Sequence, residues 1–486
     1  DGSNEHIAID SNRCILCGRC IRACQEVVAN DTLDFGNRGK ETKVIADNDV
    51  PLGESSCISC GACVQVCPTG SIFDKHSAYK GDEIQSDSTE SYCAECSIGC
   101  GIDVFHRSNN LVRIEGDESE ESGGQLCEKG RFKTVSDTRK RIQKPYINKD
   151  GEKQELTAEE AVKQVKKLLA GSENISSMAS DRLPTETVEL FQRVMKGYDA
   201  EFALPGAERH ELEKEVLRDL DQFIPHIDKN ICMNNISQIL EADQVIVYDT
   251  SIVDSHPVLS SYIRRASKNG TKLMTIDPYG DKFRGYSDVT LSIGSPRAQL
   301  TEFVMEVLQE EVDSIEELST THLGGVNVHS DDVMTMASYL EGENDTIIVM
   351  GPGVDDKKSM RNILGLSVLT DNCIISLNRI SNQDLKKFDS NTSFTESETA
   401  YLFASDDRED NLGEMKELAD KSDKVIVQAA RESELTEKAD IVLPALTWSE
   451  REGSFVDING DLKEINQITE PRISIESDKE LVRELI

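Results

Sequence analysis

Twelve of the fourteen cysteines fall into short runs whose spacing suits metal binding. The first run, Cys14 to Cys24, reads C-x2-C-x2-C-x3-C, and the second run, Cys57 to Cys67, repeats it 43 residues later. Thiolates are soft ligands, and four of them match the open corners of one 4Fe-4S cube. The spacing therefore predicts two such clusters. The alternative, a pair of zinc knuckles, would need a longer loop between its cysteine pairs.

The repeat also predicts which cysteines share a cluster. Three cysteines at two-residue gaps wrap around one cube, while the fourth points to the other cube. The first cluster is predicted to use Cys14, Cys17, Cys20 and Cys67, and the second to use Cys57, Cys60, Cys63 and Cys24. Gly18 and Gly61 follow the second cysteine of each run, where glycine lets the backbone approach the cluster. The second run ends in the Cys-Pro pair typical of bacterial ferredoxins.

A third set of cysteines has the spacing C-x2-C-x3-C-x26-C and consists of Cys93, Cys96, Cys100 and Cys127. Residues 101–106 and 111–115 flank a Ser-Asn-Asn turn, which predicts a hairpin that brings Cys127 back to the first three. We expect a third 4Fe-4S cluster here, with a zinc site as the alternative. The two remaining cysteines, Cys232 and Cys373, are isolated, and each is expected to be a buried free thiol.

The elements that position these motifs follow from periodicity. Thr157 and Glu160 form a predicted capping box, and the apolar residues after them recur at helical spacing. Short apolar runs predict strands at residues 244–248, 272–276, 346–350, 400–404 and 424–428, with helix-like segments between them, such as 258–267. Strands that alternate with helices predict an α/β fold with a doubly wound parallel sheet. Gly351-Pro352-Gly353 follows one strand and is interpreted as a plain turn.

The composition excludes several functions. The net charge of -37 opposes binding to nucleic acid or anionic lipid. It indicates either a solvated acidic surface or a docking face for a basic partner. No apolar run is long enough for a membrane span, and no signal peptide opens the chain, so we expect a cytoplasmic protein. The first cysteine run already begins at Cys14, which is compatible with an upstream domain that is missing from this sequence or lies on another chain. His106, His210 and His256 are interpreted as structural, and no catalytic residue is predicted.

The order of the motifs resembles the molybdopterin oxidoreductase superfamily. It is similar to the large iron–sulfur subunits of NAD-linked formate dehydrogenase and NADH-quinone oxidoreductase. Residues 126–131 resemble the segment after the last cluster cysteine, and the resemblance places Lys129 between that cluster and the pterin. Other matching segments are residues 112–117, 254–257, 275–278, 436–444 and 450–456.

The sequence also departs from the catalytic members. They supply a cysteine or selenocysteine to the metal, yet residues 204–221, where it is expected, contain no cysteine. Asp249 stands where the family has a turn that meets the nucleotide, and its carboxylate would repel a pyrophosphate. The catalytic members continue into a further domain that closes over the pterin, and we expect this domain to be absent from this chain, with a separate chain as its alternative place. These differences predict a vestigial molybdenum site without bis-molybdopterin guanine dinucleotide.

We therefore expect four parts. Residues 1–88 form a ferredoxin-like domain with two clusters, 89–145 a small β domain with the third, 146–445 Rossmann-like doubly wound α/β domains, and 446–486 a C-terminal tail. The predicted function is electron transfer within an NADH-linked oxidoreductase, either ferredoxin-linked or electron-bifurcating. Its expected partners are a flavin-bearing NADH dehydrogenase-type subunit and ferredoxin or another electron-transfer subunit. The alternatives are the catalytic subunit of a molybdenum or tungsten formate dehydrogenase, and an assembly protein with structural clusters.

Overall fold

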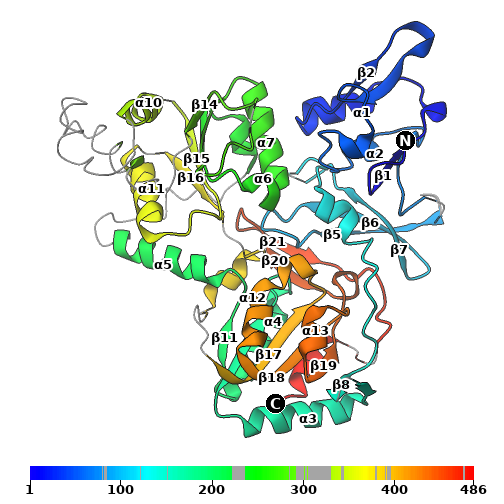
Figure 1. The fold of residues 1–486 in the computed structure, drawn as a ribbon, viewed down its shortest axis with the longest axis vertical. Helices are drawn as coiled ribbons and strands as arrows, with labels where there is room; N and C mark the ends of the chain where they lie inside the picture. Colours follow the sequence, from blue (N-terminus) through cyan, green and yellow to red (C-terminus); the bar gives the residue numbers. More distant parts are fainter. Residues whose placement is uncertain are drawn as a thin grey trace.

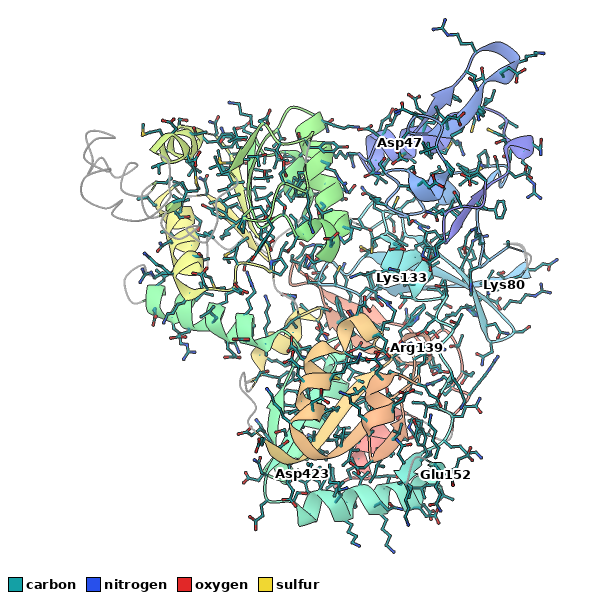
Figure 2. All side chains as sticks on the ribbon, in the orientation of Figure 1. Asp47, Lys80, Lys133, Arg139, Glu152 and Asp423 are labelled. Carbon is teal, nitrogen blue, oxygen red and sulfur yellow. The ribbon has the colours of Figure 1, made fainter. Side chains whose placement is uncertain are left out.

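A computed structural model gives the arrangement of the chain (Figure 1). It describes residues 1–78, 80, 85–120, 122–149, 152–221, 236–283, 285–291, 300–301, 304, 330–340, 344–370, 372–377, 380–388, 390, 396–473, 475 and 477–486. The N-terminal part lies at one end of the molecule, beside a small sheet, and two larger α/β parts lie next to them. Figure 2 adds the side chains, including Asp47 in the N-terminal part and Asp423 in one α/β part.

The N-terminal part consists of two short hairpin-like pairs and two one-turn helices. Strand β1 (Ile7–Ile9) pairs antiparallel with β4 (Ile72–Asp74), and β2 (Leu33–Gly36) pairs antiparallel with β3 (Lys43–Ala46). Helices α1 (Arg19–Arg22) and α2 (Ala62–Gln65) begin directly after the glycine of each cysteine run. The repeat in the sequence is therefore also a repeat in the backbone.

A three-stranded antiparallel sheet carries the third cysteine set. It contains β5 (Asp87–Tyr92), β6 (Gly101–Arg107) and β7 (Asn110–Gly116) in that order. The predicted hairpin is confirmed as β6 and β7, and its turn residues Ser108 and Asn109 have φ values of 49° and 60°. Such left-handed residues match the twist of a two-residue hairpin connection.

A seven-stranded sheet forms the first α/β part, in the order β11-β10-β17-β18-β19-β8-β9. Its strands are β8 (Tyr146–Lys149), β9 (Glu152–Glu155), β10 (Ile175–Ala179), β11 (Glu201–Ala203), β17 (Ser397–Ser405), β18 (Ser422–Ala429) and β19 (Ile441–Pro444). Neighbouring strands run parallel, except that β8 pairs antiparallel with both β19 and β9. Its helices are α3 (Ala158–Gly171), α4 (Thr185–Gly197), α12 (Gly413–Asp420), α13 (Glu434–Lys438) and α14 (Asp478–Arg483).

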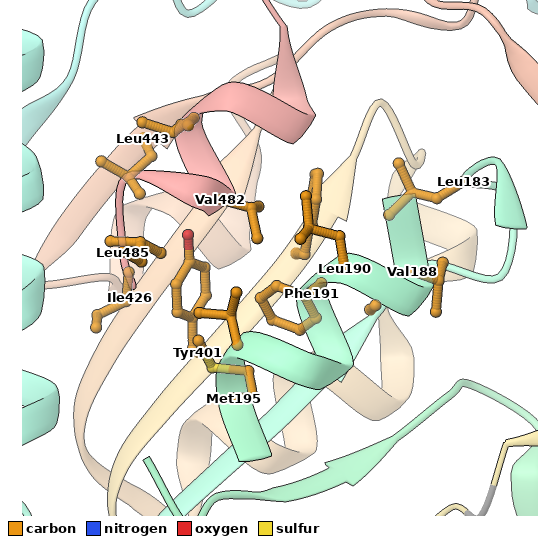
Figure 3. Packing of buried hydrophobic residues seen from close by; sticks show 14 of the residues in the cluster. Leu183, Val188, Leu190, Phe191, Met195, Tyr401, Ile426, Leu443, Val482 and Leu485 are labelled. Carbon is orange, nitrogen blue, oxygen red and sulfur yellow. The ribbon is translucent and has the colours of Figure 1, made fainter. Parts of the chain in front are cut away.

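Both faces of this sheet are covered. Side chains of α3, α4 and α14 pack on one face and those of α12 and α13 on the other. Figure 3 shows the first core, in which Phe191 of α4 packs edge-on against Tyr401 of β17, with ring centroids 5.1 Å apart. The predicted capping box is present at the start of α3, where Thr157 and Glu160 bond reciprocally.

The C-terminal residues belong to this core. Residues 446–486, predicted as a tail, contain the hairpin of β20 (Gly453–Val456) and β21 (Leu462–Ile465) as well as α14. Val482 and Leu485 are fully buried against the sheet (Figure 3). The segment is thus part of the folded α/β layer structure.

A five-stranded parallel sheet forms the second α/β part, in the order β14-β13-β12-β15-β16. Its strands are β12 (Gln244–Tyr248), β13 (Lys272–Ile276), β14 (Val289–Leu291), β15 (Thr346–Met350) and β16 (Cys373–Ser376). Its helices are α5 (Ala207–Asp221), α6 (Ile252–Ser255), α7 (Pro257–Lys268), α10 (Ser330–Leu340) and α11 (Lys357–Leu369). Helices α5, α10 and α11 cover one face, while α7 and the β5–β7 sheet cover the other.

Helix α7 joins this second sheet to the cysteine-bearing parts. Its Ser261 Oγ lies 2.9 Å from the carbonyl oxygen of Val28 and 2.7 Å from Oε1 of Gln125, and its one proton can be donated to either oxygen. Pro257 occupies its first turn, where the missing N–H costs no helical hydrogen bond. The helix therefore contacts both the segment that follows the first cysteine run and the segment that precedes Cys127.

The predicted α/β fold is confirmed, with one difference. The five predicted strands are all present, but they belong to two sheets, because β17 pairs with β10 and β18 rather than with β12, β13 or β15. Within the described part of the chain, no helix combines the length and apolar character needed to cross a bilayer.

Candidate metal centres

The first group of thiols brings together residues from both runs. Group one consists of Cys14, Cys17, Cys20 and Cys67, which line one cavity of about 140 Å³. Burial raises the pKa of Cys20 to about 11, and the charges of Cys67, Cys14 and Cys17 add to the rise. The fourth cysteine of the second run thus lies with the first three of the first run, as the spacing predicts.

Group two shows the reciprocal arrangement. It consists of Cys24, Cys57, Cys60 and Cys63, which line a second cavity. Burial raises the pKa of Cys63 well above its usual value, and the charges of Cys60, Cys57 and Cys24 act in the same direction. Cys20 of group one also contributes to this rise, so the two groups are neighbours.

Group three lies beside the β5–β7 sheet. It consists of Cys93, Cys96, Cys100 and Cys127, of which Cys100 is buried and the other three are half-buried. Burial raises the pKa of Cys96 to about 12, and repulsion from the charge of Cys127 adds to this rise. The backbone N–H of Cys93 donates to the carbonyl of Cys100 at 2.9 Å, which closes the loop around the thiols.

The local backbone repeats between groups one and two. Leu16 and Ser59, each two residues after the first cysteine of a run, have φ values of 55° and 53°. Their N–H groups donate to the sulfurs of Cys14 and Cys57, both at 3.4 Å. N–H groups aimed at sulfur stabilise the negative charge of a bound thiolate.

These donor sets fit iron–sulfur cubes. Four neighbouring thiols lose their protons only if a metal takes up the negative charge, because burial and mutual repulsion oppose ionisation. Each group supplies four soft sulfur ligands, and groups one and two combine them with backbone donors. Groups one, two and three would therefore hold one 4Fe-4S cluster each.

One segment connects group two to group three. A Cβ atom on Gly130 would lie 3.0 Å from Sγ of Cys93, so the backbone touches group three at this residue. The next residue, Arg131, is 3% exposed and donates from Nε to the carbonyl of Cys60 at 2.9 Å. Nη2 of Arg131 donates to Oε1 of Gln65 at 2.8 Å. Residues 130 and 131 thus span the gap between the two groups.

Lys129 is the residue that the family resemblance places between the last cluster and the pterin. It lines a cavity of about 370 Å³ together with Cys60, Cys127, Pro257 and Arg264. Its charge adds to the effect of burial, which lowers the pKa of His256 to about 4. A role for Lys129 in cofactor binding stays a prediction.

The nucleotide position at the end of β12 is occupied by a carboxylate. Asp249 is 6% exposed and accepts from the N–H of Gly353 at 2.5 Å and from the hydroxyl of Ser251 at 2.8 Å. A Cβ atom on Gly351 or Gly353 would lie within 2.7 Å of Asp249 atoms. The turn after β15 therefore already has an anionic partner, and its residues do not fit a dinucleotide pyrophosphate.

The three histidines interpreted as structural each have a hydrogen-bond partner at 3.0 Å. His106 bonds to the hydroxyl of Thr89, His210 to the carbonyl of Lys386, and His256 to the hydroxyl of Ser97. Cys373 is disulfide-bonded and half-buried, which corrects the expectation of a buried free thiol. The expectation for Cys232 lies outside the described residues. Residues 207–221 of the window searched for a metal-binding cysteine form α5.

Three family models match consecutive parts of the chain. A 4Fe-4S dicluster domain matches residues 13–71, and the Fe4S4 domain of molybdopterin oxidoreductases matches residues 87–134. The model of molybdopterin oxidoreductase itself matches residues 141–486. The chain belongs to the molybdopterin oxidoreductase family.

Individual relatives of this molybdopterin oxidoreductase are distant. The probable oxidoreductase YjgC of Bacillus subtilis is 25% identical over 57% of this chain and 32% of its own length. One subunit of the NADH-quinone oxidoreductase of Rhizobium meliloti is 28% identical over 54% of this chain and 30% of its own length. The chain thus matches about a third of the length of these relatives.

A solved structure shares the fold. Acetylene hydratase from Pelobacter acetylenicus matches with a TM-score of 0.55 at 12% identity. The match covers 82% of this chain and 68% of the hydratase. At this identity the likeness concerns the fold alone.

Proposed function

We propose that this chain is an iron–sulfur electron-transfer subunit of a multi-subunit, NADH-linked oxidoreductase. In this proposal groups one, two and three each hold a 4Fe-4S cluster, whose chemistry is the gain and loss of one electron. The observation that carries the proposal is the continuous arrangement of the twelve thiols. Group one adjoins group two, and residues 130 and 131 connect group two to group three.

The chain's own residues support this role in two ways. Backbone N–H groups of Leu16 and Ser59 are aimed at ligand sulfurs, which lowers the cost of adding negative charge. Cys100 of group three is 8% exposed, so a charge change at this ligand meets less solvent rearrangement than at an exposed one. Both features suit rapid exchange of electrons rather than a purely structural site.

The proposal assigns no pterin chemistry to the chain. Asp249 takes the N–H of Gly353 at the sheet edge where a nucleotide would otherwise bind. A flavin-bearing partner subunit would then handle the nicotinamide, in agreement with the relative named as a subunit of NADH-quinone oxidoreductase. Twelve cysteines that bind iron as thiolates suit the reducing conditions of the cytoplasm, where the disulfide of Cys373 would be an exception.

A second candidate is the catalytic subunit of a molybdenum or tungsten formate dehydrogenase. The feature that favours it is the cavity of about 370 Å³ beside Lys129, together with relatives named for formate dehydrogenase. Under this alternative, the cavity would belong to a pterin site that tolerates Asp249.

Metal analysis and spectroscopy distinguish these functions. The protein should be purified without oxygen, together with any subunits that accompany it, and assayed for iron, molybdenum and tungsten. We expect iron without molybdenum or tungsten, and paramagnetic resonance signals that develop on reduction with dithionite. One molybdenum or tungsten atom per chain would favour the formate dehydrogenase. Iron that never changes its redox state would exclude electron transfer and indicate a structural role.

A further inference from the structure

The surface around group one exposes apolar side chains. Ile15, Leu16 and Phe35 have exposed fractions of 63%, 41% and 43%, which place them among the most exposed large hydrophobic residues of the described chain. Cys17, a member of group one, is itself exposed. Grouped apolar residues on a surface mark interaction sites more often than isolated ones do.

Cationic side chains share this surface. Arg19 and Lys43 line the group-one cavity together with Ile15 and Leu16. Nη1 of Arg22 and the ring of Phe35 lie 3.4 Å and 3.6 Å from the position of a Cβ atom on Gly18. We call this surface the group-one face, and it consists of Ile15, Leu16, Arg19, Arg22, Phe35 and Lys43.

The charge of the face is opposite to that of the chain. The net charge of the whole chain is -37, yet residues 11–25 contain three arginines and neither aspartate nor glutamate. Arg13 and Lys43 have carboxylate partners, Asp10 at 3.3 Å and Asp49 at 2.8 Å. Among the described residues, Arg19 and Arg22 form no ion pair. Their charges therefore remain available to an incoming molecule.

The internal repeat shows that cluster binding does not require these residues. The second run keeps the cysteines and the glycine, but at the positions equivalent to Leu16, Arg19 and Arg22 it has Ser59, Ala62 and Gln65. Ala62 and Gln65 belong to α2, and Gln65 bonds Gly116 and Arg131 inside the protein. Leu16, Arg19 and Arg22 thus have no counterpart in the second run, whereas Ile15 has one in Ile58.

The geometry points to the group-one face as the docking site of a small, acidic, soluble electron carrier of the ferredoxin class. This inference rests on the proposed function of the chain. An acidic carrier is repelled by the negative surface elsewhere, so the arginines select the one orientation that brings it to group one. One electron then passes between the carrier and the cluster of group one. The carrier is oxidised when the cluster is reduced, or the reverse, and no atom is transferred.

The decisive experiment exchanges residues between the two runs. A double variant, Arg19→Ala with Arg22→Gln, gives the first run the residues that the second run has at these two positions. A charge-reversal variant, Arg19→Glu with Arg22→Glu, tests the sign of the charge. Its control, Arg193→Glu with Arg483→Glu, makes the same change in net charge on exposed positions of α4 and α14.

The measurement is the second-order rate of electron transfer from a reduced, purified acidic two-cluster ferredoxin, followed by stopped flow without oxygen. We expect a loss of about tenfold or more in both face variants and little change in the control. Reduction by methyl viologen should remain unchanged in all of them. Equal rates in the face variants and the unmodified protein would overturn the inference, and so would an equal loss in the control.

Reduction of the unmodified protein by dithionite distinguishes failure of the proposed function from failure of the docking inference. If dithionite produces no paramagnetic signals in the unmodified protein, the proposed function itself fails. If dithionite reduces the clusters but ferredoxin does not, only the docking inference fails. Protection of the group-one face by a tightly bound flavin-bearing subunit would also overturn it, because that subunit would then occupy the site of the carrier.

Discussion

The guanidinium of Arg131 donates from Nε to the backbone carbonyl of Cys60, 71 residues earlier in the chain, at 2.9 Å. Its two other acceptors, the carbonyl of Ile114 and Oε1 of Gln65, are also uncharged. Within the described residues no carboxylate lies at ion-pair distance from this buried cation. A buried cation needs negative charge nearby, and the thiolate of Cys60, the carboxylate of Glu115 beyond ion-pair distance, and the thiolate of Cys63 can supply it.

Arg131→Met should lower the reduction potential of the cluster held by group two. The arginine stabilises the negative charge that reduction adds, and its loss should cost about 1–2 kcal/mol, on the order of 40–90 mV for one electron. Arg131→Lys should restore part of the shift, because it keeps the charge. A redox titration followed by paramagnetic resonance measures the effect.

The control for this titration is Arg113→Met, which removes a cation that already pairs with Glu115 at 2.9 Å. Its effect on group two should be small. An unchanged reduction potential in the Arg131→Met variant, with the cluster intact, would show that the charge of the guanidinium does not act on the cluster of group two.

Gly61→Ala should damage group two, whereas Gly18→Ala should be tolerated better. Both glycines have left-handed backbones, with φ values of 73° and 71°, so both variants carry a strain of about 1–2 kcal/mol. Only at Gly61 would the new Cβ meet the Cδ of Arg131, at 2.2 Å; at Gly18 the nearest atom is 3.4 Å away. Iron content and thermal unfolding measure the difference, and equal losses in the two variants would refute it.

Asp478→Asn should stabilise the fold at neutral pH. Burial raises the pKa of this carboxyl to about 6, so the folded state keeps a proton that the unfolded chain releases near its usual value of 3.8. Unfolding therefore becomes easier as the pH rises from about 4 to about 6. Removal of the ionisable group should remove this dependence, worth at most about 3 kcal/mol above pH 6.

Denaturant unfolding at pH 4.5 and at pH 7 checks this expectation. The matched control is Asp423→Asn on the exposed start of β18 (Figure 2), which should change the free energy of unfolding by about 0.5 kcal/mol or less at both pH values. A stability gain in the Asp478 variant that is the same at both pH values would contradict the assignment of a raised pKa.

The sequence predicts those features of the fold and the site that depend on residues close together in the chain or on the internal repeat. The grouping of Cys67 with the first run, the hairpin of β6 and β7 and the capping box at Thr157 all depend on short spacings or on a repeat. The division of the strands into two sheets was not predictable, because periodicity shows that β17 is a strand but not which strand it pairs with.

Two contacts at the site escaped sequence analysis for a related reason. Arg131 was visible only as part of a family segment, and its contact with Cys60 depends on how separate domains pack. Asp249 was expected to repel a pyrophosphate, but the sequence did not show that it accepts from Gly353, which is 104 residues away. Neither contact has a local signal, since each joins single residues across long stretches of chain.

The central claim is that three groups of four thiols each hold one cluster, and the most direct test is the iron content of Cys63→Ser. The unmodified protein should contain about twelve iron atoms per chain, four for each cluster. The variant should lose the paramagnetic signal of group two, and with it about four iron atoms, while the signals of groups one and three remain. Full iron content and an unchanged spectrum in the variant would contradict the account.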